Sequence, residues 1–304
     1  MCELNSDKTN NRIKDIYREI YSLVKQIPEG KVSTYKRIAE AMGDPLAARG
    51  VAEALSINPL PVKIPCHRVV HEDLTLGGFR FGIEEKKRML ENEGITIEKN
   101  RVKAEIFDDF RSTEILEQMK AEQEKMSKKV ELEDSDFELV AGFDVSYSDR
   151  FAKGAICIMN KKLEPIEVRT GYEPSCMPYI PTYLGFRELP LFRKLSKGLK
   201  NVLYFIDGNG IMHPRFCGSA CMLGLEANAP AIGVAKSKLL GEISENRVVY
   251  KGRQVGWKKN NLFISQGNKI SLQKALELTG QFSIYKMPEP LRLAHINARI
   301  SKQR

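Results

Sequence analysis

Two groups of residues in this sequence have types and settings that suit catalysis, and the first centres on Cys66. Cys66 is followed by His67 within the largely apolar run 64–70. A thiol is a good nucleophile near neutral pH only as the thiolate, which requires a nearby base or positive charge. Neighbouring side chains of a strand point to opposite faces, so the two residues can cooperate only if the chain turns at Pro65. A lone cysteine is more often buried and inert, and the adjacent histidine favours a nucleophile here.

The second group consists of acids in otherwise apolar segments. Asp144 interrupts the run 139–147, and Asp207 follows the run 201–206. A carboxylate inside a buried strand is unfavourable unless it is paired, hydrogen-bonded or bound to a metal. Glu188, in a predicted helix, is placed to converge on both acids. Such oxygen ligands suit Mg²⁺ or Mn²⁺ and indicate metal-assisted phosphodiester cleavage; strand-end acids that accept backbone hydrogen bonds are the alternative.

The segments around Cys66 have helical spacing of apolar residues. Helices are predicted over residues 12–26, 35–42, 44–56 and 84–93. The turn between the second and the third, at Gly43 and Asp44, gives the pattern of a helix-turn-helix. In the third helix, Arg49 is the one long side chain among small residues in the first turns. This helix could therefore approach DNA closely, although a tightly packed core helix fits the same composition.

The segments around the acids alternate between strands and helices, which is typical of an α/β layer fold. Strands are predicted over residues 139–147, 153–160, 165–172, 201–206 and 231–235. The second and the third of these are expected to be antiparallel. Between the two halves, residues 104–138 are rich in charged residues, and part of this segment is predicted to be a joining helix. We therefore expect two domains, 1–104 and 105–304, the second including that helix.

The composition agrees with two domains and with a nucleic-acid partner. The chain has 304 residues, of which 42% are hydrophobic, and a net charge of +9 with a pI near 9.1. Both halves have a small excess of Lys and Arg, which suits two DNA-binding surfaces. Six cysteines without close pairing predict a reducing, cytoplasmic location without disulfides. Nothing resembles a membrane span or a secretory signal, so no membrane partner is expected.

The first half resembles the active-site domain of O6-alkylguanine-DNA alkyltransferases over residues 12–103. The motifs that carry the resemblance are residues 32–35 (Val-Ser-Thr-Tyr), 47–51 (Ala-Ala-Arg-Gly-Val), 58–59 (Asn-Pro), 64–70 (Ile-Pro-Cys-His-Arg-Val-Val) and 91–94 (Glu-Asn-Glu-Gly). The resemblance implies a mainly α domain with a helix-turn-helix, which binds double-stranded DNA containing alkylated guanine. Transfer to the protein's own cysteine is stoichiometric and requires no cofactor.

The same resemblance implies a role for each matching residue. Cys66 would accept the alkyl group, His67 would relay its proton through water, and Glu93 would orient the histidine. The remaining residues would hold the DNA or the pocket: Tyr35 helps to rotate the damaged nucleotide out of the helix, Arg49 fills the space it leaves, Asn58 holds the turn at the active site, and Val69 lines the base pocket. Phe79 and Phe81 are bulkier than the family's usual residues, so acceptance of large alkyl groups stays open.

From about residue 112 onward the chain resembles endonuclease V, a deoxyinosine-directed nuclease with an RNase H-like α/β fold. The motifs are residues 142–147 (Gly-Phe-Asp-Val-Ser-Tyr), 178–181 (Pro-Tyr-Ile-Pro), 186–190 (Phe-Arg-Glu-Leu-Pro), 207–215 (Asp-Gly-Asn-Gly-Ile-Met-His-Pro-Arg), 232–237 (Ile-Gly-Val-Ala-Lys-Ser) and 288–295 (Pro-Glu-Pro-Leu-Arg-Leu-Ala-His). The resemblance implies a metal-dependent nick at the second phosphodiester 3′ of deoxyinosine, the product of adenine deamination. Asn209 stands where the family commonly has histidine, and Cys221 likewise replaces a usual histidine, which leaves lesion preference and metal affinity open.

Here too the resemblance implies residue roles. Asp144 and Asp207 would bind Mg²⁺ or Mn²⁺, and Glu188 would be a third ligand or would position the attacking water. The other members would complete the site or contact DNA: His295 completes the acidic cluster, Lys236 contacts phosphate, and Pro178, Tyr179, Ile180 and Pro181 form a wedge that props the strands open beside the lesion. We therefore predict a bifunctional DNA-repair protein. Two alternatives remain at this stage: a first half that binds damage without repairing it, and a nuclease that acts on inosine in RNA.

Overall fold

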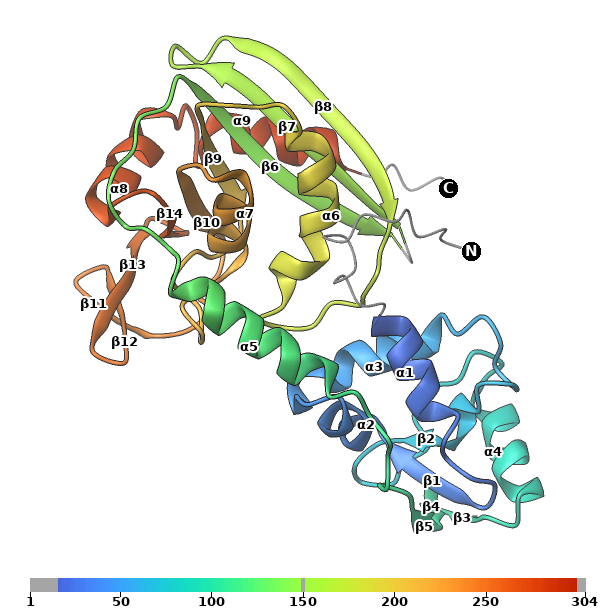
Figure 1. Cartoon of the computed structure of the whole chain (residues 1–304). Coiled ribbons are helices and arrows are strands. Elements are labelled where there is room, and N and C mark those ends of the chain that lie inside the picture. Colours follow the sequence, from blue (N-terminus) through green and yellow to red (C-terminus); the bar gives the residue numbers. More distant parts are fainter. Residues whose placement is uncertain (1–15, 149–150, 300–304) are drawn as a thin grey trace. The chain divides into compact units, whose positions relative to one another are not determined.

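The computed structural model describes residues 16–148 and 151–299, which form two units (Figure 1). The first unit comprises the described residues up to Met119 together with Cys176–Pro181, and the second comprises Lys120–Ser175 and the described residues from Thr182 onward. Helix α5 (Ile115–Ser127) carries the chain from one unit into the other. It is the charged helix predicted within residues 104–138. Among the described residues, no helix is both long enough and apolar enough to cross a bilayer.

The first unit is built from short helices around a small core. Its helices are α1 (Ile16–Val24), α2 (Tyr35–Ala41), α3 (Ala48–Ser56) and α4 (Ile83–Asn92). Short strands accompany them: β1 (Lys31–Thr34), β2 (Val69–Val70) and β5 (Glu105–Ile106) form a parallel sheet, and β3 (Thr96–Glu98) pairs with β4 (Arg101–Lys103). The helices confirm the sequence prediction; of the first predicted helix, residues 12–15 lie outside the described residues.

The helix-turn-helix is set by its capping residues. The Thr34 hydroxyl accepts a hydrogen bond from the backbone N–H of Arg37 at 3.2 Å, which caps α2. Gly43 has a φ of +99°, a conformation that glycine adopts without steric cost. The Asp44 carboxylate then accepts a hydrogen bond from Leu46 N at 3.0 Å. The segment after this cap starts with a 3₁₀ turn, Pro45–Ala47, and only then becomes the α-helix α3.

The second unit is organised around one mixed sheet. Within the described residues this sheet has nine strands, in the order β11-β12-β13-β14-β10-β9-β6-β7-β8. Their bounds are β6 (Leu139–Ser148), β7 (Phe151–Asn160), β8 (Pro165–Pro174), β9 (Val202–Asp207), β10 (Ala231–Ala235), β11 (Glu242–Ser244), β12 (Arg247–Tyr250), β13 (Arg253–Lys259) and β14 (Leu262–Asn268). The strands β6, β9 and β10 are parallel to one another. Strand β7 is antiparallel to both β6 and β8, and its antiparallel arrangement with β8 was predicted. The strands β11 to β14 were not predicted.

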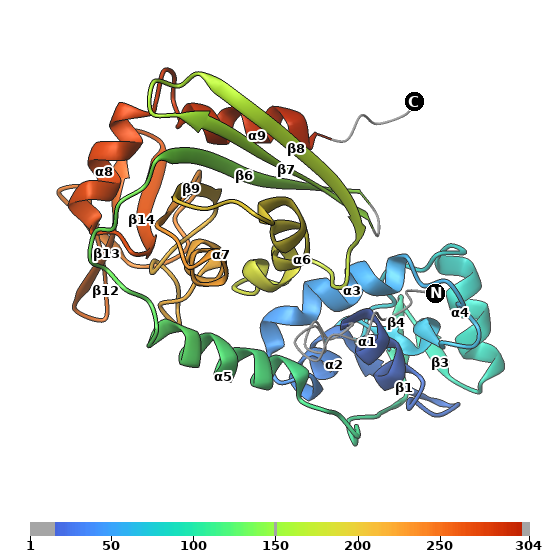
Figure 2. The ribbon, with the colours of Figure 1, turned by 45° about the horizontal axis from the view of Figure 1, so that its top comes forward.

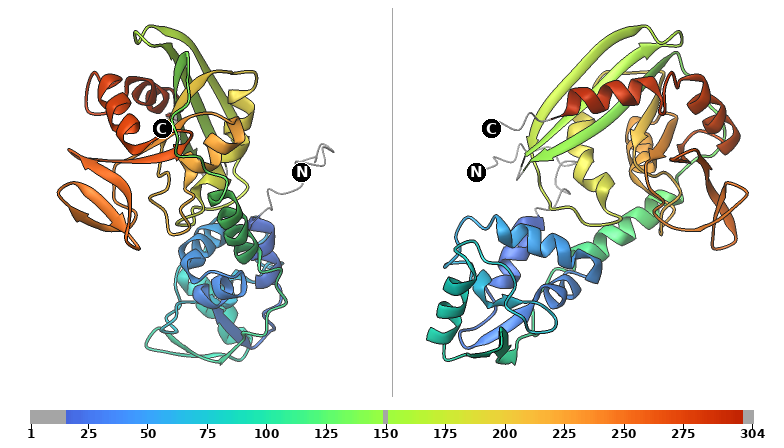
Figure 3. Two further views of the ribbon diagram at one scale, coloured as in Figure 1. Left: turned by 60° about the vertical axis from the view of Figure 1, so that its left-hand side comes forward. Right: turned by 180° about the vertical axis from the view of Figure 1, so that it is seen from behind.

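Helices cover both faces of this sheet (Figures 2 and 3). One apolar core joins it to α6 (Leu184–Ser196) and α7 (Ser219–Ala227), and a second joins it to α8 (Leu272–Gln281) and α9 (Glu289–Ala298). Central strands with both faces covered need apolar side chains on each. This explains why the sequences of β6, β9 and β10 are nearly continuous apolar runs, in which a buried acid is conspicuous.

Candidate functional sites

The turn expected at Cys66 is present. After Pro65, residues Cys66–Arg68 form a short 3₁₀ helix, so Cys66 and His67 are no longer on opposite faces of a strand. Both side chains are buried, with relative exposures of 4% and 2%. The amide of Asn58 donates to the carbonyl of Ile64 at 3.0 Å and to the Cys66 sulfur at 3.1 Å. Asn58 therefore connects the two sides of the turn and contacts the nucleophile itself.

A carboxylate fixes the orientation of the histidine. His67 Nε2 lies 2.7 Å from Glu93 Oε1, and Nδ1 is buried without a hydrogen-bond partner among the described residues. Burial alone would raise the pKa of Glu93, but hydrogen bonds from Arg68 and His67 lower it. Burial lowers the pKa of His67 even though Glu93 opposes the shift. A neutral imidazole whose Nε2–H points to Glu93 leaves Nδ1 as the base.

Arg68 is a part of this site that the sequence analysis missed. Its guanidinium donates to both oxygens of Glu93, at 2.8–3.1 Å, and to the carbonyl of Ile27 at 2.8 Å. Such a fork holds a carboxylate more rigidly than a single hydrogen bond does. Its position directly after His67 in the sequence was the one signal that could have identified Arg68 as part of the site.

A pocket of about 350 Å³ opens beside Cys66. Its lining includes Tyr35, Leu55, Cys66, His71, Phe79 and Arg80. The rings of Tyr35 and His71 lie 5.5 Å apart, and those of Phe79 and His67 lie 6.3 Å apart. Of the other residues predicted for this half, Arg49 is exposed on α3, and Val69 is fully buried and is not among the residues that line the pocket.

Charges around the pocket oppose the effect of burial on the thiol. Burial raises the pKa of Cys66, whereas the hydrogen bond from Asn58 and the charge of Lys86 lower it. Burial, with a contribution from the Cys66 charge, raises the pKa of Tyr35 to about 12. Tyr35 is therefore a neutral phenol that can donate a hydrogen bond into the pocket at any physiological pH.

In the second unit, parallel pairing brings two acids together. Strands β6 and β9 are neighbours in which Phe143 faces Ile206, so the next residues, Asp144 and Asp207, lie side by side at the same end of the sheet. His295 on α9 contacts Asp144, with 2.7 Å between Nδ1 and Oδ2. One ligand atom from each of these three side chains lies within 4.8 Å of the others. This is a donor set that could hold a divalent cation.

Glu188 approaches these acids from α6. It is buried, with 4% of its surface exposed, and its Oε2 has no hydrogen-bond partner among the described residues. Burial and the charges of Asp144 and Asp207 raise its pKa well above the usual value. Glu188 is not one of the three residues with mutually close ligand atoms. Lys236 contributes a positive charge, 3.2 Å from Asp207 Oδ2. Crowded acids, of which Asp144 and Glu188 are buried, beside the exposed Lys236 fit a hard cation.

The position of His295 depends on a glycine of β6. A Cβ added to Gly142 would lie 2.2 Å from the backbone of Pro290 and Leu291 at the start of α9. Only a residue without a side chain allows this approach, and the approach places α9, and with it His295, over the strand that carries Asp144. Gly142 is part of the sequence motif around Asp144, but the sequence alone did not show why a glycine is needed there.

We expect Gly142→Ala to displace α9 and to lower nicking roughly 10–100-fold, the usual effect of losing a supporting contact at a metal site. It should also lower the free energy of unfolding by about 1–3 kcal/mol through overpacking. Single-turnover nicking rates and urea unfolding measure the two effects. The matched control is Gly171→Ala on β8, where an added Cβ would meet only leucine side chains, at 3.2 Å or more. Equal nicking by the two variants would contradict this role for Gly142.

The predicted wedge residues belong, by their contacts, to the first unit. In the segment Cys176–Pro181, the backbone N–H of Tyr179 donates to Glu53 Oε2 at 3.4 Å. Tyr179 is 44% exposed, whereas Ile180 is buried. Tyr179 is therefore a large side chain of this segment that is open to solvent.

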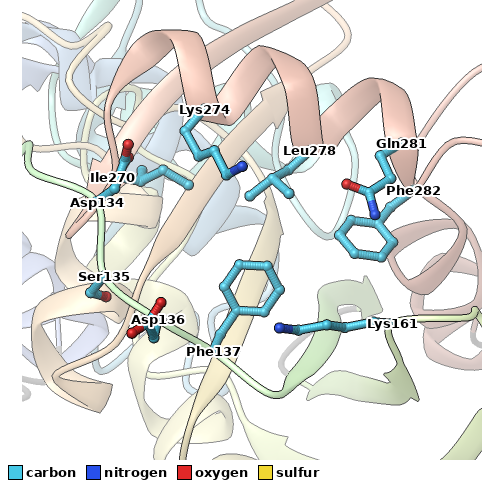
Figure 4. Close-up of a pocket in the computed structure, with 10 residues that line it drawn as sticks. All are labelled: Asp134, Ser135, Asp136, Phe137, Lys161, Ile270, Lys274, Leu278, Gln281 and Phe282. Atoms are coloured by element: carbon cyan, nitrogen blue, oxygen red, sulfur yellow. The ribbon is translucent and has the colours of Figure 1, made fainter.

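A second pocket, of about 300 Å³, lies beside α8 in the second unit (Figure 4). Its lining includes Phe137, whose ring lies 4.7 Å from Lys161 Nζ, and Asp134, which accepts a hydrogen bond from Ser271 N at 2.6 Å. None of the residues predicted to act in cleavage lines it. This pocket is therefore separate from the acidic site.

Comparison with known proteins agrees with both halves. The family model of endonuclease V matches residues 121–296, and that of the 6-O-methylguanine DNA methyltransferase DNA-binding domain matches residues 15–95. The crystal structure of human ENDOV, 27% identical, superposes with a TM-score of 0.55 and covers 60% of this chain and 96% of that one. The second unit is thus an endonuclease V fold of the RNase H-like class, and the first is an alkyltransferase domain with a helix-turn-helix.

Relatives with both parts are also known. The bifunctional methyltransferase/endonuclease of Picrophilus torridus is 38% identical over 285 residues, which is 92% of this chain and 95% of that protein. That of Thermoplasma volcanium is 35% identical and covers 92% and 88%. The chain belongs to this family of bifunctional methyltransferase/endonucleases.

Proposed function

We propose that the protein repairs two kinds of DNA damage at two separate sites. One site transfers the alkyl group of O6-alkylguanine to Cys66, and the other nicks DNA at the second phosphodiester 3′ of deoxyinosine. The corresponding domains are 1–104 and 105–304. The observation that supports the proposal is that each site brings together its own cluster of polar groups: Cys66 with Asn58, His67 and Glu93 in one, and Asp144 with Asp207, His295 and Glu188 in the other.

In the first site, Nδ1 of His67 accepts the Cys66 proton through a bridging water while Glu93 holds Nε2. The sulfur attacks the alkyl carbon, a C–S bond forms and the bond from carbon to O6 breaks. Guanine leaves with the electron pair and takes up a proton, and the protein keeps a thioether. Tyr35 and Arg49 would extrude the damaged nucleotide and fill the space it leaves, with Val69 behind the pocket.

In the second site, Asp144 and Asp207 would hold Mg²⁺ or Mn²⁺, with His295 fixing the orientation of Asp144. The cation supplies a Lewis acid for hydrolysis of the phosphodiester. Glu188, whose Oε2 is buried without a partner among the described residues, would orient the attacking water. Lys236 would contact the phosphate, and Tyr179, flanked by residues 178 and 180–181, would separate the strands beside the lesion.

Removal of divalent cations tests the separation of the two sites. With excess EDTA we expect nicking of inosine-containing DNA to fall to background, because the Lewis acid is removed and the carboxylates of Asp144 and Asp207 then repel the phosphate. Methyl transfer should proceed at its normal rate, seen as a gain of one CH₂ in the mass of the Cys66 peptide after incubation with O6-methylguanine DNA. Added Mg²⁺ or Mn²⁺ should restore the nick. A metal-independent nick, or transfer that requires a cation, would refute the assignment.

RNA is the second candidate substrate for the nuclease. A crystal structure of Ciona intestinalis endonuclease V contains DNA with an inosine followed by a ribo-adenosine. That protein is 27% identical to this chain, with a TM-score of 0.55. The test compares the cleavage rates of three matched strands that contain inosine: all DNA, all RNA, and DNA with one ribonucleotide after the inosine. Faster cleavage of the all-RNA strand would move the assignment to RNA.

A further inference from the structure

Helix α4 contains a lysine whose environment differs from that of its neighbours. Lys86, Lys87 and Arg88 follow one another, but Lys86 is fully buried, whereas the side chains of Lys87 and Arg88 are exposed. A buried ammonium is unfavourable unless it has partners of opposite charge or several acceptors. Among the described residues, no carboxylate forms an ion pair with Lys86. Burial lowers its pKa from 10.5 to about 8, which still leaves it charged at neutral pH.

The hydrogen bonds of Lys86 join two parts of the alkyl-transfer site. Its Nζ donates to the carbonyl of Val69 at 2.6 Å and to the carbonyl of Gly78 at 3.4 Å. Val69 follows the turn that carries Cys66, and Gly78 lies in the lining of the pocket beside Cys66. One ammonium therefore connects the loop at Gly78 to β2, the strand that directly follows the turn with Cys66.

Lys86 also supplies a positive charge that acts on the thiolate. Its positive charge lowers the pKa of Cys66, and the thiolate in turn raises the pKa of Lys86. Asn58 supplies a neutral donor to the same sulfur at 3.1 Å. The other titratable or charged groups near Cys66 are Tyr35, His67, Arg68, His71, Arg80 and Glu93. Of these, Arg68 is paired with Glu93, and Arg80 donates to the Asn58 carbonyl.

We propose that Lys86 is a positioning residue of alkyl transfer: it holds the loop at Gly78 against Val69 and is the counter-charge of the Cys66 thiolate. This inference rests on the proposed function of Cys66. It gives Lys86 a role that does not require contact with substrate, and it explains why this member of a run of charged residues on α4 is buried.

Three variants separate the two parts of the role. Lys86→Gln keeps an N–H donor but removes the charge, Lys86→Met removes both, and Lys86→Arg keeps the charge. Lys87→Met, on the exposed side of the same helix, is the matched control. The rate at which iodoacetamide alkylates the Cys66 peptide is measured by mass spectrometry across the pH range, together with the rate of methyl transfer from O6-methylguanine DNA.

Without the positive charge, the thiolate is less stable and Cys66 ionises at higher pH. For Lys86→Gln and Lys86→Met we expect the midpoint of the alkylation profile to move to higher pH. Each pH unit by which that midpoint rises should slow alkylation at pH 7 roughly tenfold. The difference should shrink as the pH rises to where the thiol is fully ionised. Lys86→Arg should stay near the wild type, and Lys86→Met should transfer methyl more slowly than Lys86→Gln because the loop is also released.

Several outcomes would overturn the inference. If Lys86→Gln leaves the alkylation profile unchanged, Lys86 is not the counter-charge of the thiolate. If Lys86→Gln and Lys86→Met transfer methyl at the same rate, Lys86 does not hold the loop at Gly78. A variant counts as folded if it binds an unmodified DNA duplex as tightly as Lys87→Met does. A variant that binds more weakly is set aside, and the inference is judged on the other variants. If the wild type transfers no methyl group, the proposed function fails, while the alkylation profile still tests the charge.

Discussion

Replacement of Asp207 by alanine is expected to abolish nicking at deoxyinosine while methyl transfer to Cys66 continues. Asp207 lies beside Asp144 on the neighbouring strand and supplies one of the three close ligand atoms. Loss of a cation's stabilisation of the transition state costs several kcal/mol, which corresponds to about a thousandfold in rate or more. Single-turnover cleavage of a labelled inosine-containing strand, with saturating Mg²⁺, measures this effect.

The matched control for Asp207→Ala is Glu277→Gln, which removes an exposed acid of the same unit that pairs with Lys274. It should nick at the wild-type rate. Asp207→Asn keeps the shape of the side chain and removes its charge, so it separates loss of a ligand from a packing defect. Wild-type nicking by Asp207→Asn would exclude Asp207 as a metal ligand. Loss of methyl transfer in a folded Asp207→Ala protein would refute the independence of the two sites.

Replacement of Cys66 by alanine is expected to remove methyl transfer completely, since no other atom of the pocket can form the thioether. Nicking should remain at the wild-type rate. Cys66→Ser tests the chemistry more finely, because the hydroxyl can still accept the hydrogen bond from Asn58 but is a far weaker nucleophile than a thiolate. The readout is the mass of the peptide that contains residue 66 after incubation with O6-methylguanine DNA.

Cys157→Ala is the control for this prediction. Cys157 is also buried, on β7, and burial raises its pKa to about 11, so it is an unreactive thiol at neutral pH. Its replacement should leave methyl transfer unchanged. A methyl group found on another cysteine in the Cys66→Ala protein would move the acceptor role away from Cys66. Tight binding of the lesion without any transfer by the wild type would instead favour a domain that only recognises damage.

The parts of both sites that depend on neighbours in sequence were predictable. The turn at Pro65 follows from its fixed φ, and the cap at Asp44 follows from its side chain, so the environment of Cys66 and the helix-turn-helix could be read locally. The apolar runs that contain Asp144 and Asp207 could be recognised as strands for the same reason. Local patterns did not reveal that these two strands are parallel neighbours, because their pairing is a property of the sheet.

Other features depend on tertiary packing that has no local signal. Lys86 occurs in a run of charged residues that resembles a solvated helix face, yet it is the buried member. The need for glycine at position 142 appears only once α9 is placed against β6. The strands β11 to β13 were missed because many of their residues are polar and exposed, so the apolar run that marks a central strand is absent.

The crowding of acids on β6, β9 and α6 would link the binding of a cation to the folding equilibrium of the second unit. Asp144 and Glu188 both have raised pKa values, caused by burial and then by neighbouring negative charge. In the unfolded chain these side chains are solvated and far apart. A cation that binds them is therefore a ligand of the native state alone, and the native population grows with its concentration by mass action. The concentration of such a cation would then set how much of the second unit is folded as well as how fast it cuts.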